Sequence, residues 1–170
     1  MTRRAQILWL ILAACGLAGC ASYHLGTGTT LRFSRLYIAP VTSEAQIPQA
    51  QALISTRLRE AFLKDGRVRL AESPAEADAV LQLTLTSYLR EMAVSRPDDT
   101  KLARRFDISI HAKATLTIGA GQNNAFTDRA LLAKRGVFSD SGQQQSEYQT
   151  LPLLAEILAQ EALHATLDTW

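Results

Sequence analysis

The chain has 170 residues, of which 47% are hydrophobic and 20% charged, a composition typical of one folded domain with a real hydrophobic core. The formal net charge of +2 comes from Arg3 and Arg4, because the chain from Cys20 onward carries 16 basic and 16 acidic side chains. The pI of about 8.7 is therefore no nucleic-acid signature, and we expect no nucleic-acid partner.

Residues 1–19 have the composition of a cleaved secretory signal peptide. Arg3 and Arg4 are followed by the apolar run Ile7–Ala14 and then by small residues. A transmembrane helix is the alternative, but the uncharged stretch is only about 18 residues long and rich in glycine and alanine towards its end, which makes a permanent span marginal.

The segment Leu17–Cys20 (LAGC) resembles the bacterial lipobox, in which small residues precede a cysteine that receives lipid. We expect diacylglycerol and an N-acyl chain on Cys20, and no other cofactor; a chance core cysteine is the alternative. Cys15 would leave with the leader, so the mature chain has no disulfide and no catalytic thiolate. Because Ala21 and Ser22 follow without an aspartate, the lipoprotein resemblance implies sorting to the outer membrane, with the body in the periplasm.

Residues 20–31 read as a lipidated tether, and residues 32–170 as a single domain. The domain begins with a β-rich segment at 33–41 that ends near a proline. An amphipathic helix is expected at 46–64 with Gly66 as its C-cap, followed by a short strand at 67–70 and a turn at 73–76.

Two strands alternate between apolar and polar residues, at 78–90 and 106–118. In the first, Leu81, Leu83, Leu85 and Leu89 are expected on one face, with Tyr88 and the polar residues on the other. A polar turn at 96–101 joins these strands, and the GAGQNN loop at 119–124 leads to a third strand at 129–138. We expect residues 139–148 to be a polar, mobile loop.

A second helix is predicted at 151–167, with Thr150 as N-cap and Pro152 in its first turn. Its inward residues are Leu154, Ile157, Leu158, Ala162 and Ala165. The order of elements predicts an α+β fold: a two-layer α/β sandwich whose mixed sheet of about four strands is covered on one face by two helices. The other face is expected to be open and to carry threonines, Gln82, His111 and Lys113.

An enzyme is not expected. Asp107, Ser109 and His111 form a possible Ser-His-Asp set, but successive positions on one face of a strand lie about 7 Å apart, which is too far for a triad. His24, His111 and His164 have no further ligands at metal-binding spacing. The pairs Gly26/Gly28 and Gly119/Gly121 lack the context of a phosphate loop.

A basic cluster is the remaining candidate site. If the strands at 106–118 and 129–138 form a hairpin, Lys101, Arg104 and Arg105 approach Lys134 and Arg135 at one end, with Arg129 at the other. Such a cluster would hold phosphates or an anionic partner. The alternative is a solvated surface.

Several segments, taken in order, resemble the LPS-assembly lipoprotein (LptE) family. They are Cys20-x-x-Tyr23-x-Leu25-Gly26, the strand FSRLYIAPV, a helix ending in "DG", the strand "AEADAVLQLTLTSYLRE" and the final helix "PLLAEILAQEALHATLDTW". Ser22 departs from the glycine that the family often has before the tyrosine.

The resemblance implies a plug inside an LptD-type outer-membrane β-barrel, which helps the barrel assemble and helps lipopolysaccharide reach the outer leaflet of the Gram-negative envelope. Its implied partners are that barrel, lipopolysaccharide and, through the lipid on Cys20, the inner leaflet of the outer membrane. The basic cluster would suit the phosphates of lipid A. The alternative is an accessory lipoprotein of another envelope lipid-transport or cell-wall synthesis machine.

Overall fold

The computed structural model describes residues 31–47, 49–92, 105–119, 123–138 and 143–168. Residues from Leu31 to Trp170 form one compact unit. The expected signal peptide, Cys20, nearly all of the tether and the polar turn at 96–101 lie outside the described residues. In the part of the chain that is described, no helix is both long and apolar enough to cross a membrane.

Six strands form one mixed sheet in the described part of the chain. They are β1 (Arg35–Ile38), β2 (Thr42–Ser43), β3 (Arg69–Leu70), β4 (Ala79–Met92), β5 (Arg105–Ile118) and β6 (Asn123–Phe138). The order is β3-β1-β4-β5-β6, with β2 also paired to β4. Pairings among β1, β2, β3 and β4 are parallel, whereas β4, β5 and β6 are antiparallel.

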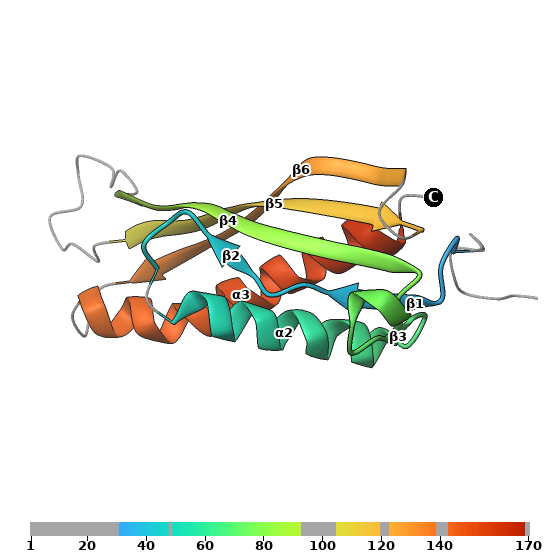
Figure 1. Cartoon of the computed structure of the whole chain (residues 1–170). Helices are drawn as coiled ribbons and strands as arrows, with labels where there is room; N and C mark the ends of the chain where they lie inside the picture. Colours follow the sequence, from blue (N-terminus) through green and yellow to red (C-terminus); the bar gives the residue numbers. More distant parts are fainter. Residues whose placement is uncertain (1–30, 48, 93–104, 120–122, 139–142, 169–170) are drawn as a thin grey trace, which may run out of the picture. The chain divides into compact units, whose positions relative to one another are not determined.

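Both long helices, α2 (Ala50–Asp65) and α3 (Gln143–Leu167), lie on the same side of the sheet (Figure 1). A short 3-10 helix, η2 (Pro74–Glu76), precedes β4. The predicted α+β two-layer sandwich is thus confirmed, with the two-residue strands β2 and β3 raising the strand number above the expected four. Gly66 is the predicted C-cap of α2: at φ 75° it donates its N–H to the Phe62 carbonyl at 3.2 Å.

The core lies between the helices and one face of the sheet. On β5, every second residue from Ile108 to Leu116 is at most 2% exposed, as the period of two predicts. Leu58 and Phe62 of α2 and Leu158 of α3 are fully buried on the helix side. Burial of each such side chain contributes about 1.5–3 kcal/mol relative to exposure, so this layer contact holds the domain together.

A β-bulge in β4 overturns part of the predicted alternation. Leu85 pairs with Ala112 and Ser87 with His111, so Thr86 is an extra residue in β4. After the bulge, each residue of β4 lies on the face of the sheet opposite to the one that strict alternation predicts. Leu89, predicted to point inward, is 44% exposed, whereas Tyr88, predicted on the polar face, packs against the core.

The last helix is longer than predicted. It begins at Gln143, so residues 143–148 are helical and not part of a loop. Thr150 is buried within the helix and is not its N-cap, and Pro152 lies in the helix interior and not in the first turn. The inward positions Leu154, Leu158, Ala162 and Ala165 are buried as predicted.

Candidate functional site

The sheet face opposite the helices is open and largely polar, as predicted. Gln82 and Lys113 are exposed there, and His111 and Thr115 are half-buried. Thr84 pairs with Lys113 in the β4/β5 register, and its hydroxyl lies 2.9 Å from the hydroxyl of Thr42 on β2. Hydroxyl and amide groups at this density suit a partner surface that also offers hydrogen bonds.

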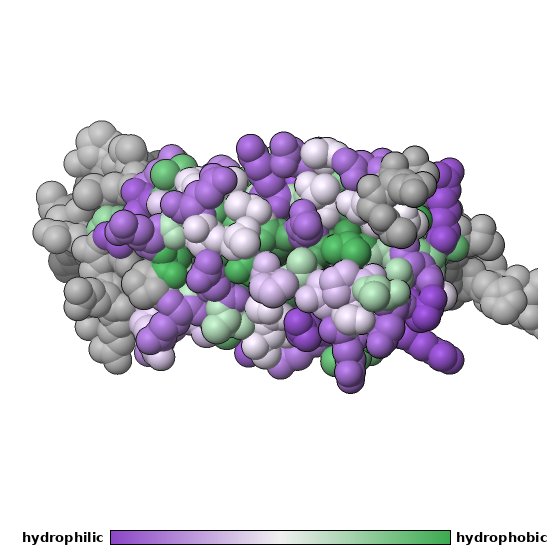
Figure 2. All heavy atoms as spheres, in the orientation of Figure 1, coloured by the Kyte–Doolittle hydropathy of each residue, from purple (hydrophilic) through white to green (hydrophobic). Residues whose placement is uncertain are grey.

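A hollow of about 590 Å³ interrupts this polar face near the start of β4. Its lining is mainly apolar and comes from β1, η2, β4, β5 and the residues that flank β1 and β4: Tyr37, Ala39, Pro74, Ala75, Ala77, Asp78, Ala79, Val80, Gln82 and Thr117. Figure 2 shows hydrophobic surface over part of β4, with surface of intermediate and hydrophilic character beside it. The hollow gives the open face one place where an apolar group of a partner fits.

Asp78 fixes the strands beside this hollow. Its Oδ2 accepts the Ser34 N–H at 3.1 Å, the Ser34 hydroxyl at 2.9 Å and the Arg35 N–H at 2.9 Å. Its Oδ1 accepts Arg35 Nη2 at 2.8 Å and Nε at 3.2 Å. The hydrogen bonds from Arg35 and Ser34 hold the pKa of the Asp78 carboxyl well below its usual range. The sequence analysis missed this carboxylate, because its partners are 43 and 44 residues away.

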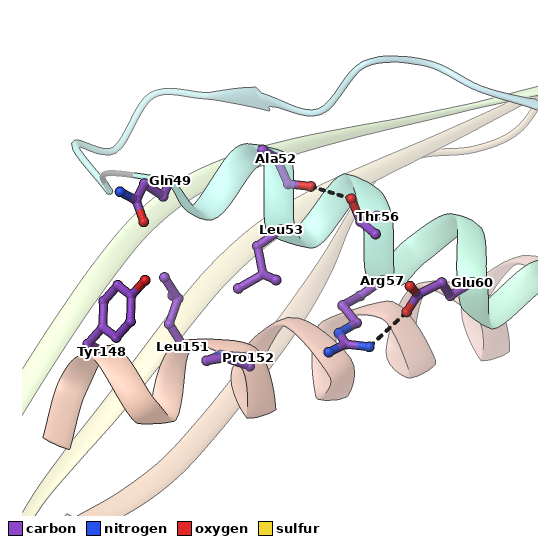
Figure 3. A pocket seen from close by; sticks show the side chains of 9 residues that line it. All are labelled: Gln49, Ala52, Leu53, Thr56, Arg57, Glu60, Tyr148, Leu151 and Pro152. Atoms are coloured by element: carbon purple, nitrogen blue, oxygen red, sulfur yellow. Dashed lines mark hydrogen bonds and ion pairs between the residues drawn. The ribbon is translucent and has the colours of Figure 1, made fainter. Parts of the chain in front are cut away.

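A groove of about 430 Å³ lies between α2 and the first turns of α3. Figure 3 shows Leu53 of α2 and Leu151 of α3 pointing towards each other across it. Tyr148, which is 70% exposed, stands at one end, and the Arg57–Glu60 ion pair (2.8 Å) stands near the other. The titratable groups among its described lining residues are Arg57, Glu60 and Tyr148, and Arg57 and Glu60 are paired with each other.

A charged network joins the C-terminal ends of the two helices. Arg67 donates to Asp65 at 2.8 and 3.0 Å and to Asp168 at 2.6 Å, and His164 Nδ1 lies 2.5 Å from Asp168. The hydrogen bond from Arg67 lowers the pKa of Asp65, and those from His164 and Arg67 lower the pKa of Asp168. The network therefore links the end of α2 to the end of α3.

Of the first predicted half of the basic cluster, the structure describes Arg105, which begins β5 at the same end of the sheet as Lys134 and Arg135. Arg105 pairs with Phe138 of β6, three residues beyond Arg135 along that strand. Lys101 and Arg104 lie outside the described residues. Arg129 lies towards the other end of β6, as expected, where it donates to the Ala165 carbonyl at 3.3 Å and covers the Phe126 ring at 5.5 Å.

Lys134 and Arg135 lie on opposite faces of the sheet. Lys134 pairs with Ser109 on the open face, and Arg135 pairs with the buried Ile108 on the helix side. Lys134 also forms ion pairs with Asp107 at 3.2 Å and Glu91 at 3.9 Å. Arg135 is exposed, and among the described residues it has no ion-pair partner.

The possible triad on β5 has no catalytic arrangement. Ser109 is buried at 6% exposure on the open face, between its register neighbours Leu89 and Lys134. Asp107 faces Lys134 and not His111. Within the described residues, no group of three or more His, Cys, Asp or Glu side chains is arranged to hold a metal ion.

Two solved structures share the fold of this chain. A minor lipoprotein of Acinetobacter baumannii superposes with a TM-score of 0.54 at 16% identity, covering 81% of this chain and 96% of that one. A hypothetical protein of Chlamydia trachomatis gives a TM-score of 0.51 at 11% identity, covering 78% and 94%. Both show the shared fold. No curated protein matches the chain by sequence.

The family model for LptE, described as lipopolysaccharide-assembly, matches residues 33–165, which include every described strand and nearly all of the last helix. This family consists of non-catalytic assembly lipoproteins, in agreement with the expectation that the chain is not an enzyme. The chain belongs to the LptE lipopolysaccharide-assembly family.

Proposed function

We propose that the chain is an outer-membrane lipoprotein that plugs an LptD-type β-barrel, assists assembly of that barrel and helps deliver lipopolysaccharide to the outer leaflet. The observation that carries the proposal is the family match over residues 33–165. The open sheet face supports it, because Gln82, Lys113 and the threonines of β4 and β5 suit the polar interior of an outer-membrane barrel.

Copurification tests the barrel partner. The full-length lipoprotein is purified from outer membranes in mild detergent, and a large β-barrel protein is expected in near-equal amount. Lys113→Glu changes the charge at the centre of the open face and is expected to weaken the complex, whereas Arg59→Glu, on the exposed side of α2, should leave it intact. Recovery of an inner-membrane transporter or a cell-wall synthase in place of a barrel would favour the alternative machine.

The anchor is a separate part of the proposal. We assign diacylglycerol and an N-acyl chain to Cys20, which would hold the protein on the inner leaflet of the outer membrane; several acyl chains anchor firmly, at about 0.8 kcal/mol per buried CH₂. Cells fed labelled palmitate should label the wild-type protein and not Cys20→Ala. An unlabelled wild-type protein would contradict the assignment.

Lipopolysaccharide contact is assigned to Lys101, Arg104, Arg105, Lys134 and Arg135. Arg135 is the strongest of the described candidates because it is exposed at the end of β6 and its guanidinium can bind a phosphate with two hydrogen bonds. Charge reversal of the five residues should weaken lipopolysaccharide binding in detergent, most strongly at low salt. Binding equal to that of the Arg59→Glu control would remove these residues from the proposal.

A further inference from the structure

The outer edge of β6 is unpaired in the described part of the chain. β6 ends the strand order β3-β1-β4-β5-β6, so its inner side pairs with β5 and no described strand lies on its outer side. In an antiparallel strand, every second residue directs its N–H and C=O away from the inner neighbour. These groups form a row that can accept another extended chain.

Only part of this edge is regular enough to be extended. Two register shifts interrupt the pairing of β6 with β5 between Asn124 and Arg129, and Asp128 has a φ of 52° there. From Arg129 to Phe138 the pairing runs without a break. This stretch spans about 30 Å at roughly 3.3 Å per residue, which is the length of a long strand.

The charged side chains along the regular stretch indicate which kind of strand could pair with this edge. Between Asp128 and Val137 the strand carries Arg129, Lys134 and Arg135 but one acidic residue, Asp128. Pairing with a second copy would place two basic strands side by side, which is unfavourable. An acidic strand has the opposite effect, because Arg129 and Arg135 lie on the helix-side face of the strand, exposed and without an ion-pair partner among the described residues, whereas Lys134 is already paired with Asp107 and Glu91.

Solvent exposure shows that the helices leave this edge open. Leu132 is 47% exposed, and Lys134, Arg135 and Gly136 are exposed as well. Leu131, Ala133 and Val137 alternate with Leu132, Lys134 and Gly136 and are buried against the helix layer, whereas Arg129 and Arg135, on the same face as the buried residues, are exposed. An added strand would therefore continue the sheet without displacing α3.

We propose that the edge from Arg129 to Val137 binds an extended acidic segment of a partner protein by β-strand addition. Backbone hydrogen bonds would supply affinity, and Arg129 and Arg135, on one face of the strand, would select acidic side chains and reject a second copy of this chain. The inference goes beyond the proposed function, because it holds whichever envelope machine supplies the segment.

The test uses the full-length protein in detergent and a fluorescent peptide of alternating valine and glutamate, about ten residues long to match the regular stretch. Fluorescence anisotropy should show saturable binding, and amide hydrogen exchange should slow within residues 129–137. A matched peptide with lysine in place of glutamate should bind at least about tenfold more weakly, as should the acidic peptide to Arg135→Glu. Binding to Arg59→Glu should be unchanged.

N-methylation separates strand addition from simple charge attraction. Methyl groups on one alternate set of peptide amides would block the hydrogen bonds to β6, and methyl groups on the other set would face solvent. We expect one methylated peptide to lose binding and the other to keep it. Equal binding of both, protection outside residues 129–137, or no saturable binding would overturn the proposal.

Discussion

At the scale of single residues, the Asp78 carboxylate accepts five hydrogen bonds. It accepts hydrogen bonds from Ser34 and Arg35, and its own backbone carbonyl accepts the Gly119 N–H at 2.8 Å. One residue thus holds the start of β1, the start of β4 and the end of β5. The hydrogen bonds of Asp78 give it a structural role in joining strands and not the role of a catalytic acid.

We expect Asp78→Asn to lower the melting temperature at neutral pH by a few degrees. The amide loses the charge that Arg35 binds and can accept fewer of the five hydrogen bonds. Because the pKa of Asp78 is lowered on folding, its contribution is present above the ordinary value of 3.8 and is lost as pH falls further. Thermal unfolding should therefore show a difference between variant and wild type that shrinks in acid; a constant difference would contradict this account.

At the scale of elements, the bulge at Thr86 decides which leucines of β4 belong to the core. Leu83 is 1% exposed, before the bulge, and Leu89 is 44% exposed, after it. Leu83→Ala should cost about 2–5 kcal/mol in the free energy of unfolding, as buried leucines do. Leu89→Ala should cost less than about 1 kcal/mol. Urea unfolding measures both, and equal costs would mean that the alternation runs unbroken.

Pro152 is the weak point of α3. It has no N–H to donate to the carbonyl four residues earlier, that of Tyr148, in the middle of a 25-residue helix. We expect Pro152→Ala to raise the free energy of unfolding by about 1–2 kcal/mol, the gain in the helix being partly offset by a freer unfolded chain. Leu153→Ala, at an exposed neighbouring position, is the control. A less stable Pro152→Ala variant would show that the proline packs favourably in the groove.

The same elements show what the sequence could predict. Periodicity was enough for α2, β4 and β5, because their apolar residues follow the spacing of a helix or a strand. It missed the Thr86 bulge, since a bulge is defined by register with β5, and the first turns of α3, since their glutamines carry no apolar period.

For the candidate site, the predicted hairpin was enough to place Arg105 and Lys134 at the same end of the sheet. Grouping Lys134 with Arg135 overlooked that adjacent strand residues face opposite sides. The role of Asp78 could not be predicted, because a single acidic residue before a strand gives no signal of a partner more than 40 residues away.

At the scale of the whole molecule, three carboxylates with lowered pKa gather at one end of the domain. Asp65 and Asp168 share Arg67, which lies two residues before Arg69 of β3. Arg69 is paired with Arg35, the partner of Asp78. Ionised groups therefore hold both parts of this end: Asp65 and Asp168 with Arg67 at the C-terminal ends of the helices, and Asp78 with Arg35 at the short parallel strands.

We expect acid to loosen this end first. Each of the three carboxyl groups has a folded pKa below its ordinary value of 3.8, so the unfolded state binds more protons and stability falls as pH drops below that value. Amide exchange, corrected for the intrinsic rate, should rise at about pH 3 in β1, β3 and the last turn of α3. The middle of β5 near Ile110, held by apolar packing, should stay protected. Uniform loss of protection would show instead that the domain unfolds in acid as one unit.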